Sequence, residues 1–446
     1  MNAGAQVPAN TRYSSREALC ILAVILATTV TLSLVVTPLN QIADPVRRSL
    51  AIDDVQFSYL LGAFAAIPSM AMTVIGGWLA DRMSRRRLLA TAMLFWTFGA
   101  IASAFASSFE MLMAARLLVA TAAGAKFPVV MTWIAEAFPP ERRGRAIGGV
   151  FTFIGIGPAV GATLSGVVIH AAQQGQSLLP FLDGLEPWRT ALLLLALPNF
   201  LVIPCILLLP ERGKDDGSTR TEQTGDGRSA PLLLLGIAML ATALLTLADN
   251  ANLSWLPTIL SRQHNLDARE VGIAFGAVVT AAGILGPLFA GMADGPVSRW
   301  YGAPGRMIVC AAAALLCAPL LASFVDASSS QFLAALALNG VLTMLATTMG
   351  FVAFQALLSP AHRGAGIGIA QAVNNLAAAA APTIVALVAS MTPAKTGAIG
   401  HGMAWVASGG FVSSAVAWIA CAYWISRRRH DYGMREAVRR NANTAK

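Results

Sequence analysis

The chain has 446 residues, of which 56% are hydrophobic and only 12% are charged. Soluble globular proteins carry about 25% charged residues, so this composition excludes that class and indicates a membrane protein. The formal net charge of +9 at pH 7 would suit a nucleic-acid partner. The positions of the basic residues along the chain favour a different explanation, given below.

Apolar runs recur along the whole chain. Because about 20 apolar residues in a helix cross the hydrocarbon layer of a bilayer, each run predicts a transmembrane helix. The predicted fold class is therefore an all-α polytopic membrane protein with twelve transmembrane helices. The predicted spans cover residues 18–39, 57–80, 88–108, 111–136, 146–171, 188–209, 231–256, 271–292, 305–324, 331–358, 364–391 and 402–425.

A polar segment, Glu211 to Ser229, separates the sixth and seventh spans and has the composition of a linker. Six spans on each side of such a linker indicate two pseudo-symmetric halves, related as parallel repeats. The predicted organisation is an N-tail (1–17), an N-terminal six-helix half (18–209), a linker (210–230), a C-terminal six-helix half (231–425) and a C-tail (426–446).

Lysine and arginine residues are distributed unevenly between the two sides of the predicted membrane. With both termini on one side, that side holds 23 of these residues and the other side holds six. Basic residues are enriched in cytoplasmic loops, so both termini are predicted to be cytoplasmic in a cell inner (plasma) membrane. The positive charge then reflects topology and contact with anionic lipids, and we expect no nucleic-acid partner.

The fourth span contains two cations, Arg116 and Lys126, within an apolar run. A charged side chain in the middle of a bilayer costs about 3 kcal/mol and is functional by default. Small residues, Ala120 and Ala123, share the face of Arg116, and its planar guanidinium suits a carboxylate or phosphate. Arg116 is therefore predicted to bind an anionic substrate, with an interhelical structural bond as the alternative. For Lys126 three roles stay open: a second contact for the anion, a group that titrates, or a residue that extends its charged end toward the inner side of the membrane.

Asp249, in the outer part of the seventh span, is predicted to couple transport to a proton or to pair with Arg116. The alternative is an acid at a helix end, which the nearby Pro257 favours. Uncharged amides on several spans complete the predicted substrate site. Each one alone favours helix–helix bonding, but together they outline a polar cavity. They are Asn250, Asn252, Gln355, Gln371, Asn374 and Asn375.

The sequence contains no pattern that indicates an enzyme. No ATP-binding loop is present, the histidines and cysteines have no metal-ligand spacing, and no nucleophile or paired carboxylates stand out. We therefore expect neither a cofactor nor a metal.

The loop between the second and third spans reads Gly77-Trp-Leu-Ala-Asp81-Arg82-Met-Ser-Arg85-Arg86-Arg87. It resembles the signature loop of the major facilitator superfamily, with Ser84 in place of the commonest glycine. The resemblance implies gating roles for Gly77, Asp81, Arg82, Arg85 and Arg86, with Asp81 pairing with the other half to stabilise the outward-open state. Positive-inside anchoring alone would explain the arginines but not Asp81.

A degraded second copy, Gly291-Met-Ala-Asp294-Gly-Pro-Val-Ser-Arg299, follows the eighth span. The loops that open the fifth and eleventh spans, PPERRGR and PAHRG, are also paired between the halves. The resemblance thus covers the whole chain. It implies the superfamily's fold, alternating access, a gating role for Asp294 and a monomer.

Within the superfamily, Asp54-Val-Gln56, the DRMSRR form of the loop and PPERRGRA resemble spinster-like proteins and the anion:cation symporters. Members of those groups often carry an Asp-Arg pair in the first span and a glutamate seven residues after the arginine of the fourth span. This chain has Leu34-Val35-Val36 and Ala123 at those places. It therefore lacks the usual proton-binding carboxylates.

Gly157-Pro158, followed by Gly161, resembles an element of the fifth span that is frequent in antiporters, and it is a second gating candidate. The predicted function is secondary active transport of a small organic anion, a carboxylate, across the inner membrane by alternating access. The alternatives are an efflux antiporter, an exporter of lipid-like or amphipathic compounds, and a sensor without translocation. The expected partners are the anionic substrate, protons as a second candidate and membrane lipids.

Overall fold

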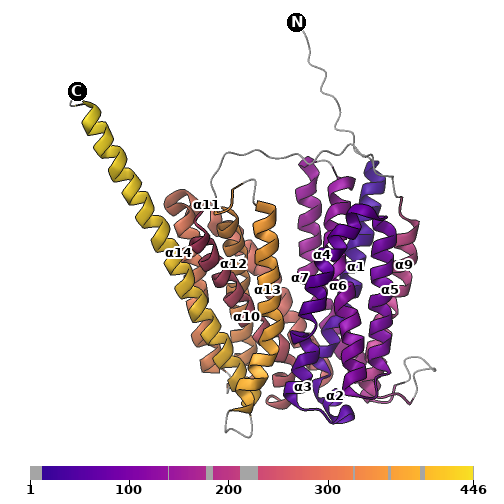
Figure 1. Ribbon diagram of the computed structural model, residues 1–446. Helices are drawn as coiled ribbons and strands as arrows, with labels where there is room; N and C mark the ends of the chain where they lie inside the picture. Colours follow the sequence, from indigo (N-terminus) through magenta and orange to yellow (C-terminus); the bar gives the residue numbers. More distant parts are fainter. Residues whose placement is uncertain are drawn as a thin grey trace. The chain divides into compact units, whose positions relative to one another are not determined.

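The computed structural model of the chain (Figure 1) describes residues 13–138, 140–176, 184–210, 230–324, 327–359, 363–391 and 397–444. These residues are almost entirely helical. The helices are α1 (Ser15–Gln41), α2 (Ala43–Leu50), α3 (Asp54–Ser58), η1 (Tyr59–Ala63), α4 (Ala66–Arg82), α5 (Arg85–Ala104), α6 (Phe109–Ala137), α7 (Pro140–Gln173), α8 (Pro187–Ala196), α9 (Pro198–Leu208), α10 (Leu232–Arg262), α11 (Ala268–Phe324), α12 (Ser329–Gln355), α13 (Arg363–Ser390) and α14 (Ala398–Thr444).

The described residues hold eleven helices that are long and apolar enough to cross a membrane, together with a shorter apolar helix, Pro304–Leu320. Each predicted span overlaps one of these twelve, so the predicted fold class is confirmed. Two spans consist of more than one helix: α3, η1 and α4 form the second, and α8 and α9 form the sixth. Conversely, α11 contains two spans, which meet at Gly302. Gly302 has φ +63°, a conformation that glycine adopts without a steric penalty.

Short polar residues fix where several helices begin. Ser108 accepts a hydrogen bond from the backbone of Met111 at the start of α6, and Ser84 accepts one from Arg87 at the start of α5. Asp53 and Gln56 form a reciprocal capping box at the start of α3. Such caps satisfy backbone N–H groups that have no partner within the helix. The Asp54-Val-Gln56 segment therefore opens the second span.

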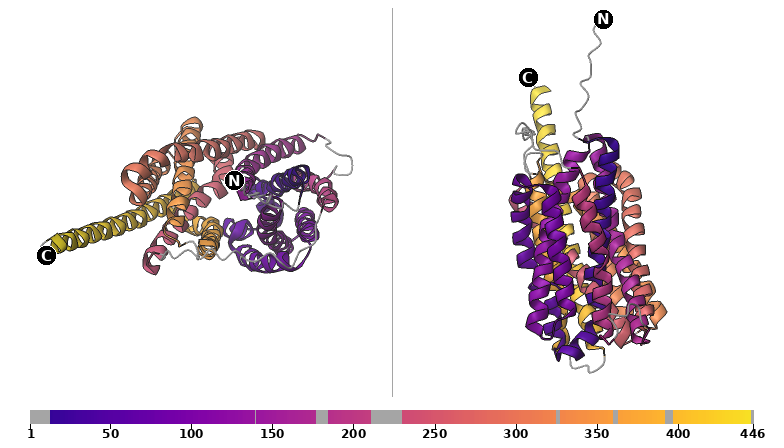
Figure 2. Two further views of the ribbon diagram at one scale, coloured as in Figure 1. Left: turned by 90° about the horizontal axis from the view of Figure 1, so that it is seen from above. Right: turned by 90° about the vertical axis from the view of Figure 1, so that its right-hand side faces the viewer.

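The chain forms two compact units. Unit 1 comprises Met1–Thr219 with Asn265–Gly276, and unit 2 comprises Arg220–His264 with Ala277–Lys446. Within unit 1, α1 packs on α7, and α6 packs on both α4 and α5. Within unit 2, α10 packs on α12, α13 and α14. The helices of each unit run side by side as a bundle (Figure 2).

Aromatic side chains fill the core of each unit. Trp133 and Trp188 are fully buried in unit 1, and Trp255 and Trp418 are fully buried in unit 2. Glycines allow the closest helix contacts. A Cβ atom on Gly166 of α7 would lie 2.8 Å from the Cα atom of Gly272 in the first turns of α11. Such backbone approach is typical of helices packed in membranes.

The predicted boundaries of the halves, tails and linker stay predictions. Most of the N-tail (1–12), almost all of the linker (211–229) and the last two residues of the C-tail lie outside the described residues.

Candidate functional site

The fourth span, α6, places two cations inside unit 1. Arg116 is 8% exposed, and its buried Nε atom has no hydrogen-bond partner in the part of the chain that the structure describes. Among the described residues, no carboxylate or carbonyl group pairs with this guanidinium. A buried cation without a partner is strongly unfavourable for stability, and the predicted role of Arg116 in binding an anion stays a prediction.

Lys126 lies ten residues further along α6, a rise of about 15 Å. Its Nζ atom donates a hydrogen bond of 3.0 Å to the Oγ1 atom of Thr29 on α1. Thr29 is buried and donates in turn to the Ile25 carbonyl. Lys126 is therefore bonded to a neutral hydroxyl. Because an ammonium group has three N–H donors, donors of Lys126 remain for a further ligand.

Gly157 of α7 lies beside this contact. A Cβ atom on Gly157 would collide with the Ser33 hydroxyl and would lie 3.6 Å from the Thr29 carbonyl. The glycine thus gives α1 and α7 room to approach each other next to Lys126. The gating role predicted for Gly157 and Pro158 stays a prediction, and the structure supplies a packing reason for the glycine.

Three of the four arginines of the signature loop have side-chain partners within unit 1. Arg85 is ion-paired with Glu136 near the end of α6, and Arg86 donates to the Leu209 carbonyl at 3.1 Å. Arg82 lies over the ring of Trp78, 4.0 Å from its centroid. Glu136 was not among the sequence candidates, although it is an acid at the end of a span. The side chain of Asp81 lies outside the described residues, so its predicted latch role stays a prediction.

The second copy of the signature loop also contains an ion pair. The carboxylate of Asp294 accepts from the Nε and Nη2 atoms of Arg306 at 2.6 and 3.1 Å. This bidentate geometry joins the two parts of α11 across the bend at Gly302. Asp294 therefore has its partner within unit 2.

Unit 2 contains a buried amide network that involves one of the predicted residues, Asn252, and lies next to another, Asp249. Asn252 of α10 donates to the side chain of Asn339 on α12 at 3.2 Å, and Asn339 donates to the Cys317 carbonyl on α11 at 3.2 Å. Asn339, like Cys317, was not among the sequence candidates; an amide inside an apolar span was the available signal. Asp249 lies one turn before Asn252. Within the described parts of the chain, no hydrogen bond or ion pair reaches its carboxyl group.

The other predicted amides make local or interhelical bonds. Asn250 donates to the Thr246 carbonyl on its own helix. Thr242 donates to Asn374 at 3.2 Å and so joins α10 to α13. Gln371 donates to Asn375 one turn away, and Gln355 is partly buried at the end of α12. These contacts fit the helix-bonding alternative, and the predicted role of these residues in substrate binding stays a prediction.

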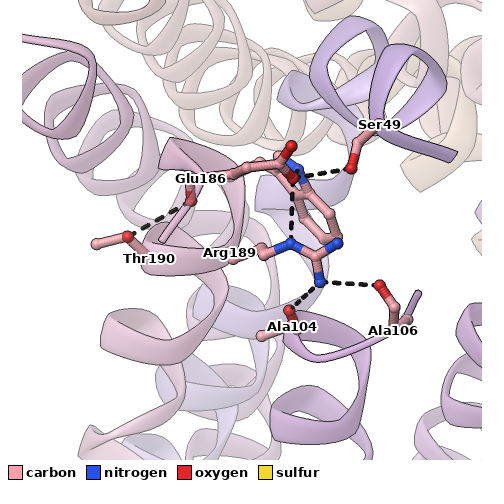
Figure 3. Close-up of polar contacts among 7 residues, drawn as sticks. Ser49, Ala104, Ala106, Glu186, Arg189 and Thr190 are labelled. Atoms are coloured by element: carbon pink, nitrogen blue, oxygen red, sulfur yellow. Dashed lines mark hydrogen bonds and ion pairs between the residues drawn. The ribbon is translucent and has the colours of Figure 1, made fainter. Parts of the chain in front are cut away.

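A polar cluster at the start of α8 joins three segments of unit 1 (Figure 3). Glu186 accepts hydrogen bonds from Ser49, Trp188 and Arg189, and Arg189 donates to the carbonyls of Ala104 and Ala106. Burial opposes ionisation of Glu186, but these hydrogen bonds outweigh it, so its pKa lies below the ordinary value. The cluster ties the ends of α2, α5 and α8 together.

Eleven apolar helices of spanning length, with cations and amides inside the bundles, define a multi-pass membrane protein. The sequence matches the Major Facilitator Superfamily over residues 18–382 and 238–440. The chain therefore belongs to this superfamily, as its signature loops predicted.

Curated relatives are transporters. The chain is 25% identical over 367 residues to the 3-(3-hydroxy-phenyl)propionate transporter of Escherichia coli, covering 80% of this chain and 83% of the relative. It is 24% identical over 264 residues to a probable sulfoacetate transporter of Cupriavidus necator, covering 55% and 58%. A match at 35% identity to an uncharacterized MFS-type transporter of Bacillus subtilis covers 28% of this chain and only 26% of that protein.

A similar solved structure is that of a bacterial homolog of the human lysosomal transporter spinster. It has a TM-score of 0.75 and 18% identity, and the match covers 92% of this chain and 96% of that one. This likeness establishes the fold.

Proposed function

We propose that this protein is a secondary active transporter that carries a small organic anion, a carboxylate, across the inner membrane by alternating access. It acts as a monomer with both termini in the cytoplasm. The observation that carries the proposal is Arg116, a buried guanidinium without a partner among the described residues. A carboxylate on the substrate would complete its hydrogen bonds in bidentate geometry.

The relatives support an organic acid as the substrate class. The names of two of them specify carboxylic acids, 3-(3-hydroxy-phenyl)propionate and sulfoacetate. Lys126 supports the same class, since its ammonium adds a second positive charge to the interior of unit 1. Substrate anions would therefore meet a positive interior, in which a cation would be repelled.

Uptake by proteoliposomes tests the proposal. The purified chain is reconstituted, and the entry of radiolabelled 3-(3-hydroxyphenyl)propionate, sulfoacetate and benzoate is compared for wild type, Arg116→Gln and Arg116→Lys. We expect saturable uptake of at least one acid and a decrease of about 10- to 100-fold for Arg116→Gln, because a hydrogen bond to a charged group contributes about 1.5–3 kcal/mol. Arg116→Lys should retain part of the activity, since it keeps the charge but not the bidentate geometry.

The matched control is Arg86→Gln, which removes a cation that donates to the Leu209 carbonyl at a helix end. Its affinity for the acid should stay at the wild-type value. Normal affinity in Arg116→Gln would contradict the role of Arg116. Transport of a zwitterionic lysophospholipid with no uptake of any acid would contradict the substrate class and support the exporter of lipid-like compounds instead.

A further inference from the structure

The interior of unit 2 contains an acid in surroundings that consist of neutral amides. Asp249 lies on α10, and the helices that pack on α10 are α12, α13 and α14. Between their described ends, α12 contributes no charged residue and α13 contributes only Arg363 in its first turn. The acid therefore has no cation from either helix at its depth in the span.

The other titratable groups on α10 and its neighbours are thiols, a distant histidine and arginines near helix ends; those of α14 begin at Arg427, 17 residues beyond Gly410. On α11, Cys317 is near enough for an electrostatic interaction with Asp249. On α14, Cys421 contacts the Leu234 carbonyl near the start of α10. His401 lies nine residues before Gly410, which contacts Ala248 next to the acid, a separation of about 2.5 turns. On α10 itself, Arg262 lies in the last turn. None of these groups supplies Asp249 with a counter-charge.

The direction of each hydrogen bond in the amide network beside Asp249 follows from the last acceptor in the network. The network ends on the backbone carbonyl of Cys317, which can only accept a hydrogen bond. The NH2 group of Asn339 must therefore face that carbonyl, and its oxygen faces Asn252. The NH2 group of Asn252 must then face Asn339, so the Asn252 oxygen points away from the network.

The Asn252 oxygen is consequently an acceptor without a donor. It is buried and has no hydrogen-bond partner among the described residues, and the residue as a whole is 4% exposed. Asp249 precedes Asn252 by three residues on the same helix, where side chains are neighbours with Cβ atoms about 5–6 Å apart. The side chain of Asn252 leans toward the N-terminus of the helix, over the turn that carries Asp249. The unsatisfied acceptor and the unpaired carboxyl group thus share one face.

We propose that Asp249 and Asn252 form a proton-binding pair, in which the protonated carboxyl group of Asp249 donates its O–H to the Asn252 oxygen. An ionised carboxylate would place negative charge beside an acceptor oxygen, whereas the protonated acid satisfies both groups. The proton comes from water on one side of the membrane and returns to water on the other side. Asn339 is a positioning residue, because it sets which atom of Asn252 faces the acid.

The pair gives the chain a proton carrier in the half that does not contain Arg116. Its role in coupling proton movement to anion transport rests on the proposed function. With a monocarboxylate bound at Arg116, one proton on Asp249 would make the transported pair electroneutral. Proton binding itself requires no substrate, so it is measured independently of transport.

Infrared difference spectroscopy of the full chain in lipid nanodiscs tests the pair. The C=O band of a protonated carboxyl group is followed against pH in H2O and D2O. We expect a band that Asp249→Asn removes. In Asn252→Leu the midpoint of its titration should fall by about one pH unit, because the hydrogen bond to the neutral form is lost.

Asn339→Leu tests the orientation without changing either member of the pair. Once released from Asn339, the amide of Asn252 can turn its NH2 group toward the acid and favour the ionised form, so the midpoint should again fall. Asn339→Leu also provides the test if Asn252→Leu does not fold. The matched control is Asn250→Leu, which removes an adjacent amide bonded only to its own helix and should leave the midpoint unchanged.

The proposal is overturned if the band persists in Asp249→Asn, or if neither Asn252→Leu nor Asn339→Leu moves the midpoint. An equal change in Asn250→Leu also overturns it. Failure of the transport proposal would appear differently, as absence of acid uptake with the infrared titration intact. For an acid that is transported, Asp249→Asn should abolish the response of uptake to an imposed pH gradient while counterflow continues.

Discussion

In unit 1, the basic residues at helix ends differ from those in the middle of the spans in their polar partners. At the ends, Arg85 is paired with Glu136, and Arg189 is paired with Glu186 and two backbone carbonyls. In the middle of α6, Arg116 has no partner among the described residues, and Lys126 has only a hydroxyl. The difference separates cations with an acidic or carbonyl partner from cations for which the described residues supply no acidic or carbonyl partner.

Unit 2 shows the complementary arrangement. Its ion pair, Asp294 with Arg306, lies at the bend of α11, and inside a span it carries an acid, Asp249, among amides. Among the residues that the structure describes, the ionisable groups without a charged partner inside the spans are thus basic in unit 1, and in unit 2 they include an acid. Unpaired charges inside a span are unfavourable for stability, so this separation is the basis of the two proposals made above, an anion site in unit 1 and a proton site in unit 2.

Removing the partner of a paired charge should have the largest effect on stability. Arg85→Gln leaves Glu136 without its counter-charge, and breaking a buried pair costs about 3–5 kcal/mol. We expect the unfolding transition of the protein in detergent to move to markedly lower denaturant concentration. A cost below about 1 kcal/mol would mean that the pair does not hold α5 to α6.

Arg116→Gln should change stability in the opposite direction. No partner is lost, and an unfavourable buried charge is removed, so we expect the free energy of unfolding to rise by about 1 kcal/mol. The same denaturant titration measures it, with Arg85→Gln as the matched arginine at a helix end. If Arg116→Gln were as damaging as Arg85→Gln, Arg116 would belong with the structural cations.

The bond between Lys126 and Thr29 should contribute a smaller amount. Thr29→Val removes the hydroxyl that accepts from Lys126 and should cost about 1 kcal/mol more than Thr28→Val. Thr28 is also buried and donates to the same Ile25 carbonyl, but it does not bind a cation. Equal costs for the two variants, measured by thermal unfolding, would show that Lys126 does not depend on this bond.

The cluster around Glu186 should give the smallest effect, together with a dependence on pH. Because the pKa of Glu186 is lower in the folded state, its contribution is complete above the ordinary carboxyl pKa of about 4.3 and is lost as pH falls through the lowered value. Glu186→Gln should therefore cost about 0.2–1 kcal/mol at pH 7. The difference from wild type should shrink below about pH 4; a difference that grew on acidification would contradict this sign.

The superfamily and the spans could be predicted from the sequence because both depend on local composition. An apolar run of about 20 residues must cross the bilayer as a helix whatever surrounds it, and the signature loops are contiguous in the chain. The intramembrane positions of Arg116, Lys126 and Asp249 were visible for the same reason. Three features of the spans were not predicted: the junction at Gly302, the division of the second span into α3, η1 and α4, and the division of the sixth span into α8 and α9. These features depend on individual residues within an apolar run.

Only the tertiary structure decided which side chains pair with one another. Glu136 faces Arg85, Asn339 faces Asn252 and Thr29 faces Lys126 across sequence separations of 51, 87 and 97 residues. No local pattern encodes which helix lies opposite a given face, because that depends on how all the helices of a bundle pack. The sequence by itself therefore determined where charges enter the membrane, and packing determined that Arg85 is compensated within its unit while Arg116 has no partner among the described residues.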